Sequence, residues 1–83
     1  MTNEKQNTGR VTQIIGPVID VIFPEGVDMP EINNALVITG RNGEKLVFEV
    51  AKHMEPGVVR AVGLTSTDGI ARGIFEVRSR RVE

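Results

Sequence analysis

Asp20 is the residue whose setting most invites a chemical role, because it lies in the apolar run IIGPVIDVIFP, residues 14–24. A carboxyl group in such surroundings could act as a catalytic acid with a raised pKa. It could instead accept hydrogen bonds from a paired arginine or from backbone N–H groups. No histidine, nucleophile or second carboxylate lies near it in the sequence, so we favour the structural role. Arg10, Arg60 and Arg72 are the candidate partners, and the sequence does not choose among them.

His53 is the single histidine, and the chain contains no cysteine. A lone imidazole is weak evidence for a metal site, because such sites combine several ligands at a characteristic spacing. We therefore interpret His53 as a surface or strand-end residue. The lack of cysteine excludes disulfide frameworks, cysteine–zinc sites and thiol catalysis. The sequence predicts no catalytic residue, no metal ligand and no cofactor-binding residue.

The stretch STDGIARG, residues 66–73, has the glycines and hydroxyl groups of a phosphate cradle. A P-loop needs a lysine followed by serine or threonine directly after its last glycine, at the start of a helix. Here Gly73 is followed by Ile74. We therefore predict a turn at Asp68 and Gly69 that joins two strands.

Three arginines near the end of the sequence could bind nucleic acid: Arg78, Arg80 and Arg81. Small barrels bind single strands through a basic groove and stacking aromatic side chains. The formal net charge is −1, however, and the chain has no tryptophan or tyrosine. Its three phenylalanines lie in apolar runs, where core packing explains them: Phe23, Phe48 and Phe75. Binding of nucleic acid or of another protein through the arginine-rich end is the alternative hypothesis.

The elements that must position these residues are short strands. The 83 residues fit one domain, and 40% of them are hydrophobic. Turn residues divide the chain at 16–17, 24–30, 40–43, 56–57 and 66–73. Between them lie segments rich in valine and isoleucine, at 10–15, 18–23, 35–39, 45–54, 58–64 and 74–77. Branching at Cβ favours strands, and connections this short force neighbouring strands to run antiparallel. The pattern predicts an all-β fold, a small six-stranded antiparallel closed β-barrel.

Three dipeptides define the predicted turns. Pro17 lacks an N–H, so Gly16–Pro17 predicts a corner where the strand ladder is interrupted. Asn42–Gly43 predicts a two-residue hairpin, because both residues tolerate positive φ. In Pro56–Gly57 the proline presets φ and the glycine can take the positive φ of a type II turn. Segment 45–54 also fits one face of a helix, but its β-branched residues favour a strand.

Three stretches together resemble one family. GRVTQIIGPVIDVIFPEG (9–26) is similar to the opening of the β subunit of rotary F-type ATP synthases. NALVI (34–38) and VVRAVGLTSTDGIARG (58–73) resemble the family's following segments, in the right order and spacing. The α subunit shares the fold but lacks the IGPVIDV form.

The resemblance implies a six-stranded barrel that is not the catalytic part of the enzyme. In the family, three such barrels alternate with three α-subunit N-terminal barrels in a crown that holds the hexamer together. ATP or ADP and magnesium bind the next domain, whose motifs do not occur here. The resemblance also implies a peripheral complex on the cytoplasmic side of an energy-coupling membrane, or on the matrix or stroma side in an organelle.

Two domain boundaries follow from this reading. Residues 1–8 are expected to form a flexible tail, and residues 9–83 a single barrel domain. After Val77 the family usually continues with Asp-Thr-Gly, whereas this chain has RSRRVE (78–83). A piece of a larger subunit and a separate short protein remain the two alternatives.

Overall fold

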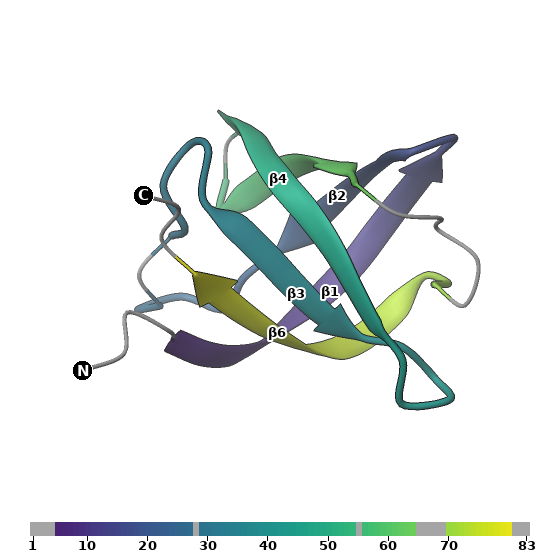
Figure 1. Cartoon of the computed structure of the whole chain (residues 1–83). Helices are drawn as coiled ribbons and strands as arrows, with labels where there is room; N and C mark the ends of the chain where they lie inside the picture. The colour runs from purple at the N-terminus through teal and green to yellow at the C-terminus, as the bar shows by residue number, and fades with distance from the viewer. Residues whose placement is uncertain (1–4, 28, 55, 65–69, 81–83) are drawn as a thin grey trace.

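The predicted fold is confirmed in the computed structural model, which describes residues 5–27, 29–54, 56–64 and 70–80. The strands are β1 (Lys5–Ile15), β2 (Val18–Ile22), β3 (Ala35–Thr39), β4 (Lys45–Met54), β5 (Val58–Gly63) and β6 (Gly73–Arg80). They close into a barrel in the order β1-β2-β5-β4-β3-β6 (Figure 1). All six neighbouring pairs run antiparallel, as the short connections require.

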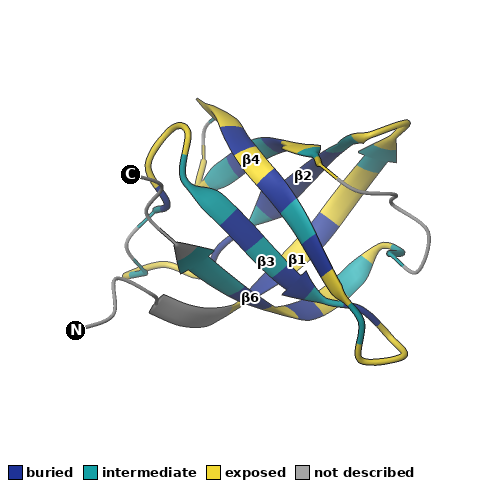
Figure 2. Ribbon diagram, viewed as in Figure 1, coloured by how far each residue is buried: buried dark blue, intermediate teal, exposed yellow. Residues whose placement is uncertain are grey.

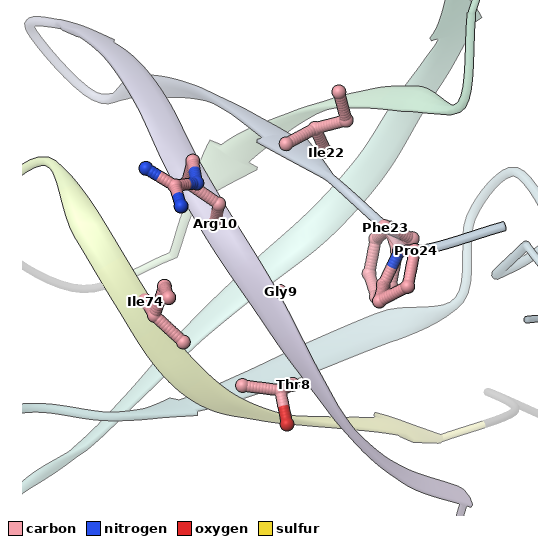
Figure 3. Close-up of a pocket in the computed structure, with 7 residues that line it drawn as sticks. All are labelled: Thr8, Gly9, Arg10, Ile22, Phe23, Pro24 and Ile74. Carbon is pink, nitrogen blue, oxygen red and sulfur yellow. The ribbon is translucent and has the colours of Figure 1, made fainter.

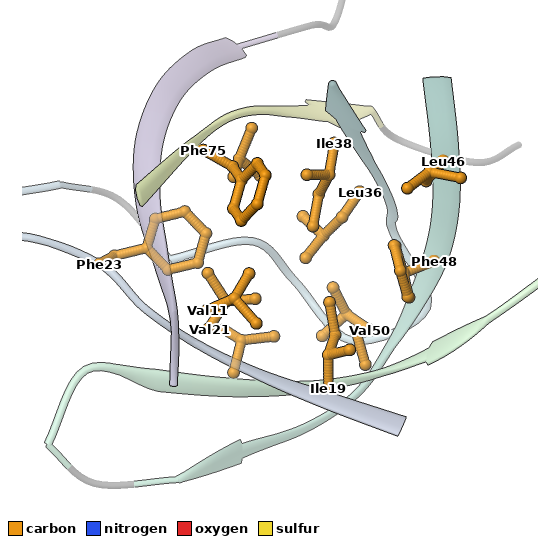
Figure 4. Packing of buried hydrophobic residues seen from close by; sticks show 13 residues of the cluster. Val11, Ile19, Val21, Phe23, Leu36, Ile38, Leu46, Phe48, Val50 and Phe75 are labelled. Atoms are coloured by element: carbon orange, nitrogen blue, oxygen red, sulfur yellow. The ribbon is translucent and has the colours of Figure 1, made fainter. Parts of the chain in front are cut away.

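The barrel interior is filled by apolar side chains that alternate along the strands. Along β4, for example, Leu46, Phe48 and Val50 are buried while Glu49 between them is exposed (Figure 2). The side chains converge on one core from all six strands and from the start of the loop after β2 (Figure 4). The members of this core are Val11, Ile19, Val21, Phe23, Leu36, Ile38, Leu46, Phe48, Val50, Val59, Ala61, Phe75 and Val77. Valine and isoleucine suit these positions because their branched Cβ packs well on a pleated surface.

Two strands extend beyond the segments that the sequence predicts. β1 begins at Lys5, so residues 5–8, which we expected in the tail, pair with β6 instead. β6 likewise runs to Arg80 rather than ending at Val77. Each extension satisfies the backbone groups of the other, as at the register pair Lys5 and Ser79. The polar side chains of residues 5–8 carry no apolar alternation, which is why the sequence pattern missed this pairing.

Segment 45–54 is a strand, as predicted, and its mixed periodicity has a structural cause. The register between β4 and β5 shifts between Val50 and Lys52, which is a β-bulge at Ala51. A bulge adds one residue to one strand and moves the following side chains to other positions. The strict alternation therefore ends at Val50, and the residues after it imitate a helical spacing.

The β3–β4 hairpin corrects one predicted turn. The loop has three residues, 41–43, because the Gly40 N–H donates to the carbonyl of Glu44 (2.7 Å) and the Gly43 N–H donates to that of Gly40 (3.0 Å). Gly43 has φ of 83°. Among the described residues, Asn33 is the one residue other than glycine with a positive φ, so Asn42 has a negative φ. Asn42 therefore does not take part in a two-residue turn. Its N–H donates to the Glu44 carboxylate (3.0 Å), which stabilises the longer loop instead.

Gly9 lies on β1 where side chains from the two neighbouring strands, β2 and β6, leave no room for a Cβ. A Cβ placed on Gly9 would lie 2.7 Å from Val21 Cγ1 and 3.2 Å from Val77 Cγ2. Both neighbours are short branched side chains in the buried core, so neither can turn away. A glycine inside a strand commonly marks such an approach, and this signal was present in the sequence.

We expect Gly9→Ala to lower the free energy of unfolding by about 1–3 kcal/mol, because the added methyl overpacks the core. Urea denaturation followed by circular dichroism measures this change. Thr8→Ala is the matched control, since Thr8 is the exposed neighbour on the same strand. Equal stabilities of Gly9→Ala and the wild-type chain would show that the contact with Val21 relaxes freely.

Candidate functional site

Asp20 and Arg60 form a two-bond ion pair on the outside of the barrel. They lie directly opposite each other in the β2–β5 register. Arg60 donates from Nε to Oδ1 of Asp20 (2.9 Å) and from Nη2 to Oδ2 (3.1 Å). This fork geometry uses both carboxylate oxygens and is the strong form of the arginine–carboxylate contact. The structure thus selects Arg60 from the three arginines that the sequence left open.

The carboxylate is covered although it points outward. Asp20 is only 6% exposed. In the described part of the chain, no other charged residue is buried. The hydrogen bonds from Arg60, and secondly the charge of Asp20, raise the pKa of the guanidinium, against a lowering by desolvation. Arg10 and Arg72 both have exposed side chains: Arg10 stands opposite Ile74 in the β1–β6 register, and Arg72 lines a hollow with residues 12–14 of β1. The pair therefore joins β2 to β5, and the predicted structural role of Asp20 has a defined partner.

His53 lies on the surface near the end of β4, as predicted. Its Nε2 donates to the carbonyl oxygen of Pro30 and so ties the loop after β2 to β4. Within the ranges that the structure describes, no three histidine or acidic side chains gather closely enough to hold a metal ion.

The predicted turn residues lie at strand connections. Gly16 has φ of 56° at the start of the two-residue link to β2, and the Pro17 carbonyl accepts from the Gly63 N–H (2.7 Å). Gly57 has φ of 67°, as the predicted type II turn requires, and its carbonyl accepts from the Phe23 N–H (3.0 Å). Gly73 opens β6 with φ of 143°. Asp68 and Gly69 lie outside the described residues.

One apolar hollow on the outer surface spans β6, β1 and β2, and we call it the β1 pocket. Its volume is about 310 Å³, and it is lined by Thr8, Gly9, Arg10, Ile22, Phe23, Pro24 and Ile74. Ile74 and Ile22 both stand opposite Arg10 in the register, one on each neighbouring strand. Figure 3 shows the Arg10 side chain beside the ribbon of β1, with Ile74 on one side and Ile22 on the other. The pocket thus combines an apolar floor with a cation at its rim.

A second apolar surface covers β5 and β4, and we call it the β5–β4 surface. It comprises Val47, Val62 and Leu64, with Glu49 beside Val62 in the register. Leu64 is 61% exposed and Val62 is 37% exposed. Leu64 continues the ladder past β5, because its N–H donates to the Val47 carbonyl (2.9 Å). The sequence did not indicate which residues form either surface, since an apolar residue in a strand gives no indication of which face it occupies.

The arginine-rich end does not gain an aromatic platform from the fold. Phe23, Phe48 and Phe75 are buried in the core, which confirms the interpretation of the phenylalanines. Arg78 is half-buried on β6, and Arg81 lies outside the described residues. Within the described residues, stacking of bases on phenylalanine is therefore not available to a nucleic-acid strand.

Comparison with protein families gives one match across most of the chain. The family model for the β-barrel domain of the ATP synthase alpha/beta family matches residues 11–78. That range includes the Asp20–Arg60 pair and both apolar surfaces apart from Thr8, Gly9 and Arg10. In the described ranges, the chain has no helix with the length and apolarity needed to cross a bilayer.

We expect Asp20→Asn to lower the urea midpoint of unfolding between about pH 5 and 8, because the buried amide cannot replace the ion pair. The pKa of Arg60 is raised from its ordinary value. Stability that depends on such a cation is fully present below the unfolded-state pKa and is lost only as pH rises through the raised folded-state pKa. The guanidinium therefore stays charged over this range, and the deficit should persist throughout it.

Glu49→Gln is the matched control, because it neutralises an exposed carboxylate on β4, which neighbours β5 but not the β2 strand of Asp20. Its urea midpoint should equal that of the wild-type chain. If Asp20→Asn behaved like this control, the ion pair would contribute nothing to the barrel.

Proposed function

Because the chain belongs to the ATP synthase alpha/beta family, of which it is the β-barrel domain, we propose that it is a non-catalytic assembly domain of a β-type subunit. In this role the barrel holds the alternating hexamer together while ATP is synthesised or hydrolysed in other domains. The similarity of IGPVIDV, residues 15–21, to the β-subunit form supports the β-type assignment. Its neighbours in the ring would be the barrels of α-type subunits.

The observation that carries the proposal is a closed barrel with apolar side chains left on its outer surface. Closure pairs both edges of every strand, so a neighbour cannot join by extending the sheet. Contact with another subunit must therefore use outward-facing side chains. Ile15, Leu64 and Ile74 are each more than 60% exposed, which is the kind of surface that a partner covers.

We further propose that nucleotide and magnesium bind the domain that follows the barrel in this family. Within the barrel, the Asp20 and Arg60 side chains bind each other through two hydrogen bonds. These groups are therefore not available to bind a nucleotide. A peripheral position on the cytoplasmic, matrix or stroma side of an energy-coupling membrane follows from the same assignment.

We expect this chain to bind the α-type barrel of its own organism with a dissociation constant of about 10 μM to 1 mM, since small interfaces between single domains are weak. Titration followed by NMR chemical shifts measures such affinities. An unrelated closed barrel of similar size and charge is the control partner. Binding to the α-type barrel that is no stronger than binding to the control would contradict the proposal.

A fluorescent single-stranded oligonucleotide at low salt tests the alternative hypothesis in the same series. Binding through arginine–phosphate contacts would fall steeply as salt is added, because counterions are released. Such binding, without binding to the α-type barrel, would replace the assembly role by a nucleic-acid role.

A further inference from the structure

We propose that Asn42 is a site of spontaneous deamidation, and that the Glu44 carboxylate protects this site while the barrel is folded. The inference concerns the loop between β3 and β4 and is independent of the proposed assembly function. The group that reacts with the Asn42 side chain is the backbone nitrogen of Gly43, and the co-reactant is water.

Asn42 lies at the tip of the β3–β4 hairpin, where solvent reaches it. In Figure 1 the loop projects from the barrel, and residues 41–43 are exposed (Figure 2). Asn42 is also the one asparagine in the sequence that is followed by glycine. Because glycine has no side chain, the backbone nitrogen next to Asn42 is open to attack the carboxamide. Both reacting groups and water therefore meet at this tip.

The reaction needs the side-chain carboxamide, the next backbone nitrogen and water. The Gly43 nitrogen loses its proton to a solvent base and attacks Cγ of Asn42. The new N–Cγ bond forms, the bond from Cγ to Nδ2 breaks, and ammonia leaves with a proton from solvent, so that a cyclic imide remains. Water then opens the imide at either carbonyl carbon. Opening at Cγ gives aspartate at position 42, and opening at the main-chain carbonyl gives isoaspartate.

Two hydrogen bonds hold the loop in a shape that opposes this attack. The Gly43 N–H donates to the Gly40 carbonyl (3.0 Å), so the proton that must leave is directed into the loop. The Asn42 N–H donates to Oε1 of Glu44 (3.0 Å), which restricts the rotation of Asn42. Cyclisation requires the Gly43 nitrogen to turn toward Cγ of Asn42. The loop must therefore open locally before the reaction can occur.

The Glu44 carboxylate is held in place by the residues around it. A Cβ on Gly40 would overlap this carboxylate, so the glycine leaves the space that the carboxylate occupies. The Gly40 N–H donates to the Glu44 carbonyl (2.7 Å), which closes the base of the loop. At the adjoining register pair, the Lys45 ammonium donates to the Thr39 hydroxyl (2.9 Å). Glu44 is thus half-buried over the loop and positioned to keep its bond to Asn42.

The product would weaken the loop that had protected the asparagine. Either product places a carboxylate at position 42, next to the Glu44 carboxylate, and like charges this close repel each other. Isoaspartate also routes the main chain through Cβ, so the hydrogen bond from Gly43 to Gly40 would lose its geometry. The core residues lie outside positions 40–44, so the effect stays local. Deamidation would therefore open this loop in a barrel that remains folded.

The test compares deamidation rates of the folded chain, its variants and an unfolded synthetic peptide of residues 39–47 in mildly alkaline buffer. Peptide mass spectrometry assigns the conversion to residue 42. We expect the folded wild-type chain to convert at least about tenfold more slowly than the peptide, because the loop must open first. Glu44→Ala should convert about three- to tenfold faster than the wild-type chain, which is the effect of one lost hydrogen bond. Glu44→Gln should keep the wild-type rate, since its amide oxygen still accepts from the Asn42 N–H.

Two controls separate protection by the fold from other effects. Glu25→Ala removes an exposed carboxylate from a different loop and should leave the rate at Asn42 unchanged. The Glu44 substitutions made in the peptide should also leave its rate unchanged, since the peptide has no folded loop. Circular dichroism checks that each variant of the chain is folded, and the comparison of wild-type chain with peptide needs no variant.

A peptide that does not convert at residue 42 would overturn the assignment of Asn42 as the site. A folded chain that converts as fast as the peptide would overturn the protection by the loop. A folded Glu44→Ala chain that converts no faster than the wild-type chain, or a Glu44→Gln chain that converts as fast as Glu44→Ala, would overturn the role of the Glu44 side chain.

Discussion

The rest of the structure depends on the closure of the strand ladder between the first and last strands. β1 must pair with β2 on one side and with β6 on the other, so the register of the two ends of the chain fixes the circumference of the barrel. A barrel of six strands is narrow, and its interior has room only for interdigitated side chains. Gly9 is required by this narrowness, because any side chain there would enter the volume of Val21. Closure also explains why polar residues 5–8 are in a strand: each open backbone position on β6 needs a partner.

Closure determines where polar chemistry can be placed. With the interior occupied by apolar groups, Asp20 faces outward, yet it is covered and joined by two hydrogen bonds to Arg60. The two residues are 40 positions apart in sequence, so the ion pair stabilises the long-range pairing of β2 with β5 that barrel closure requires. A buried carboxylate with a single arginine is weak as a source of net stability but disfavours other registers, since a shift of one residue would separate the two charges.

Sequence patterns were sufficient for the number and order of the strands, but not for the full length of β1 and β6 or for the contacts between strands. Segments 35–39 and 45–54 were predicted with the bounds that the structure has, because each is rich in apolar residues that favour strands and the turn residues 40–43 separate them. The choice of Arg60 over Arg10 and Arg72 depends on which strand lies beside β2, and this information is absent from local periodicity. The loop at 41–43 was predicted with the wrong length, because its hydrogen bonds involve Glu44 outside the Asn-Gly dipeptide. The β1 pocket could not be predicted, since it combines three strands.

A closed barrel with two different outer surfaces has a consequence for assembly. Since every strand that the structure describes is paired on both edges, contact with another barrel would leave the backbone hydrogen bonds inside this one unbroken. The core stays intact because its contacts all lie within one chain. In the proposed assembly role, the barrel would stay rigid while attached domains changed conformation, and contact with a neighbour would use exposed side chains such as Leu64 and Ile74. The physical division is therefore between an apolar interior that fixes the shape of the barrel and an exterior whose exposed side chains are available for contact with other molecules.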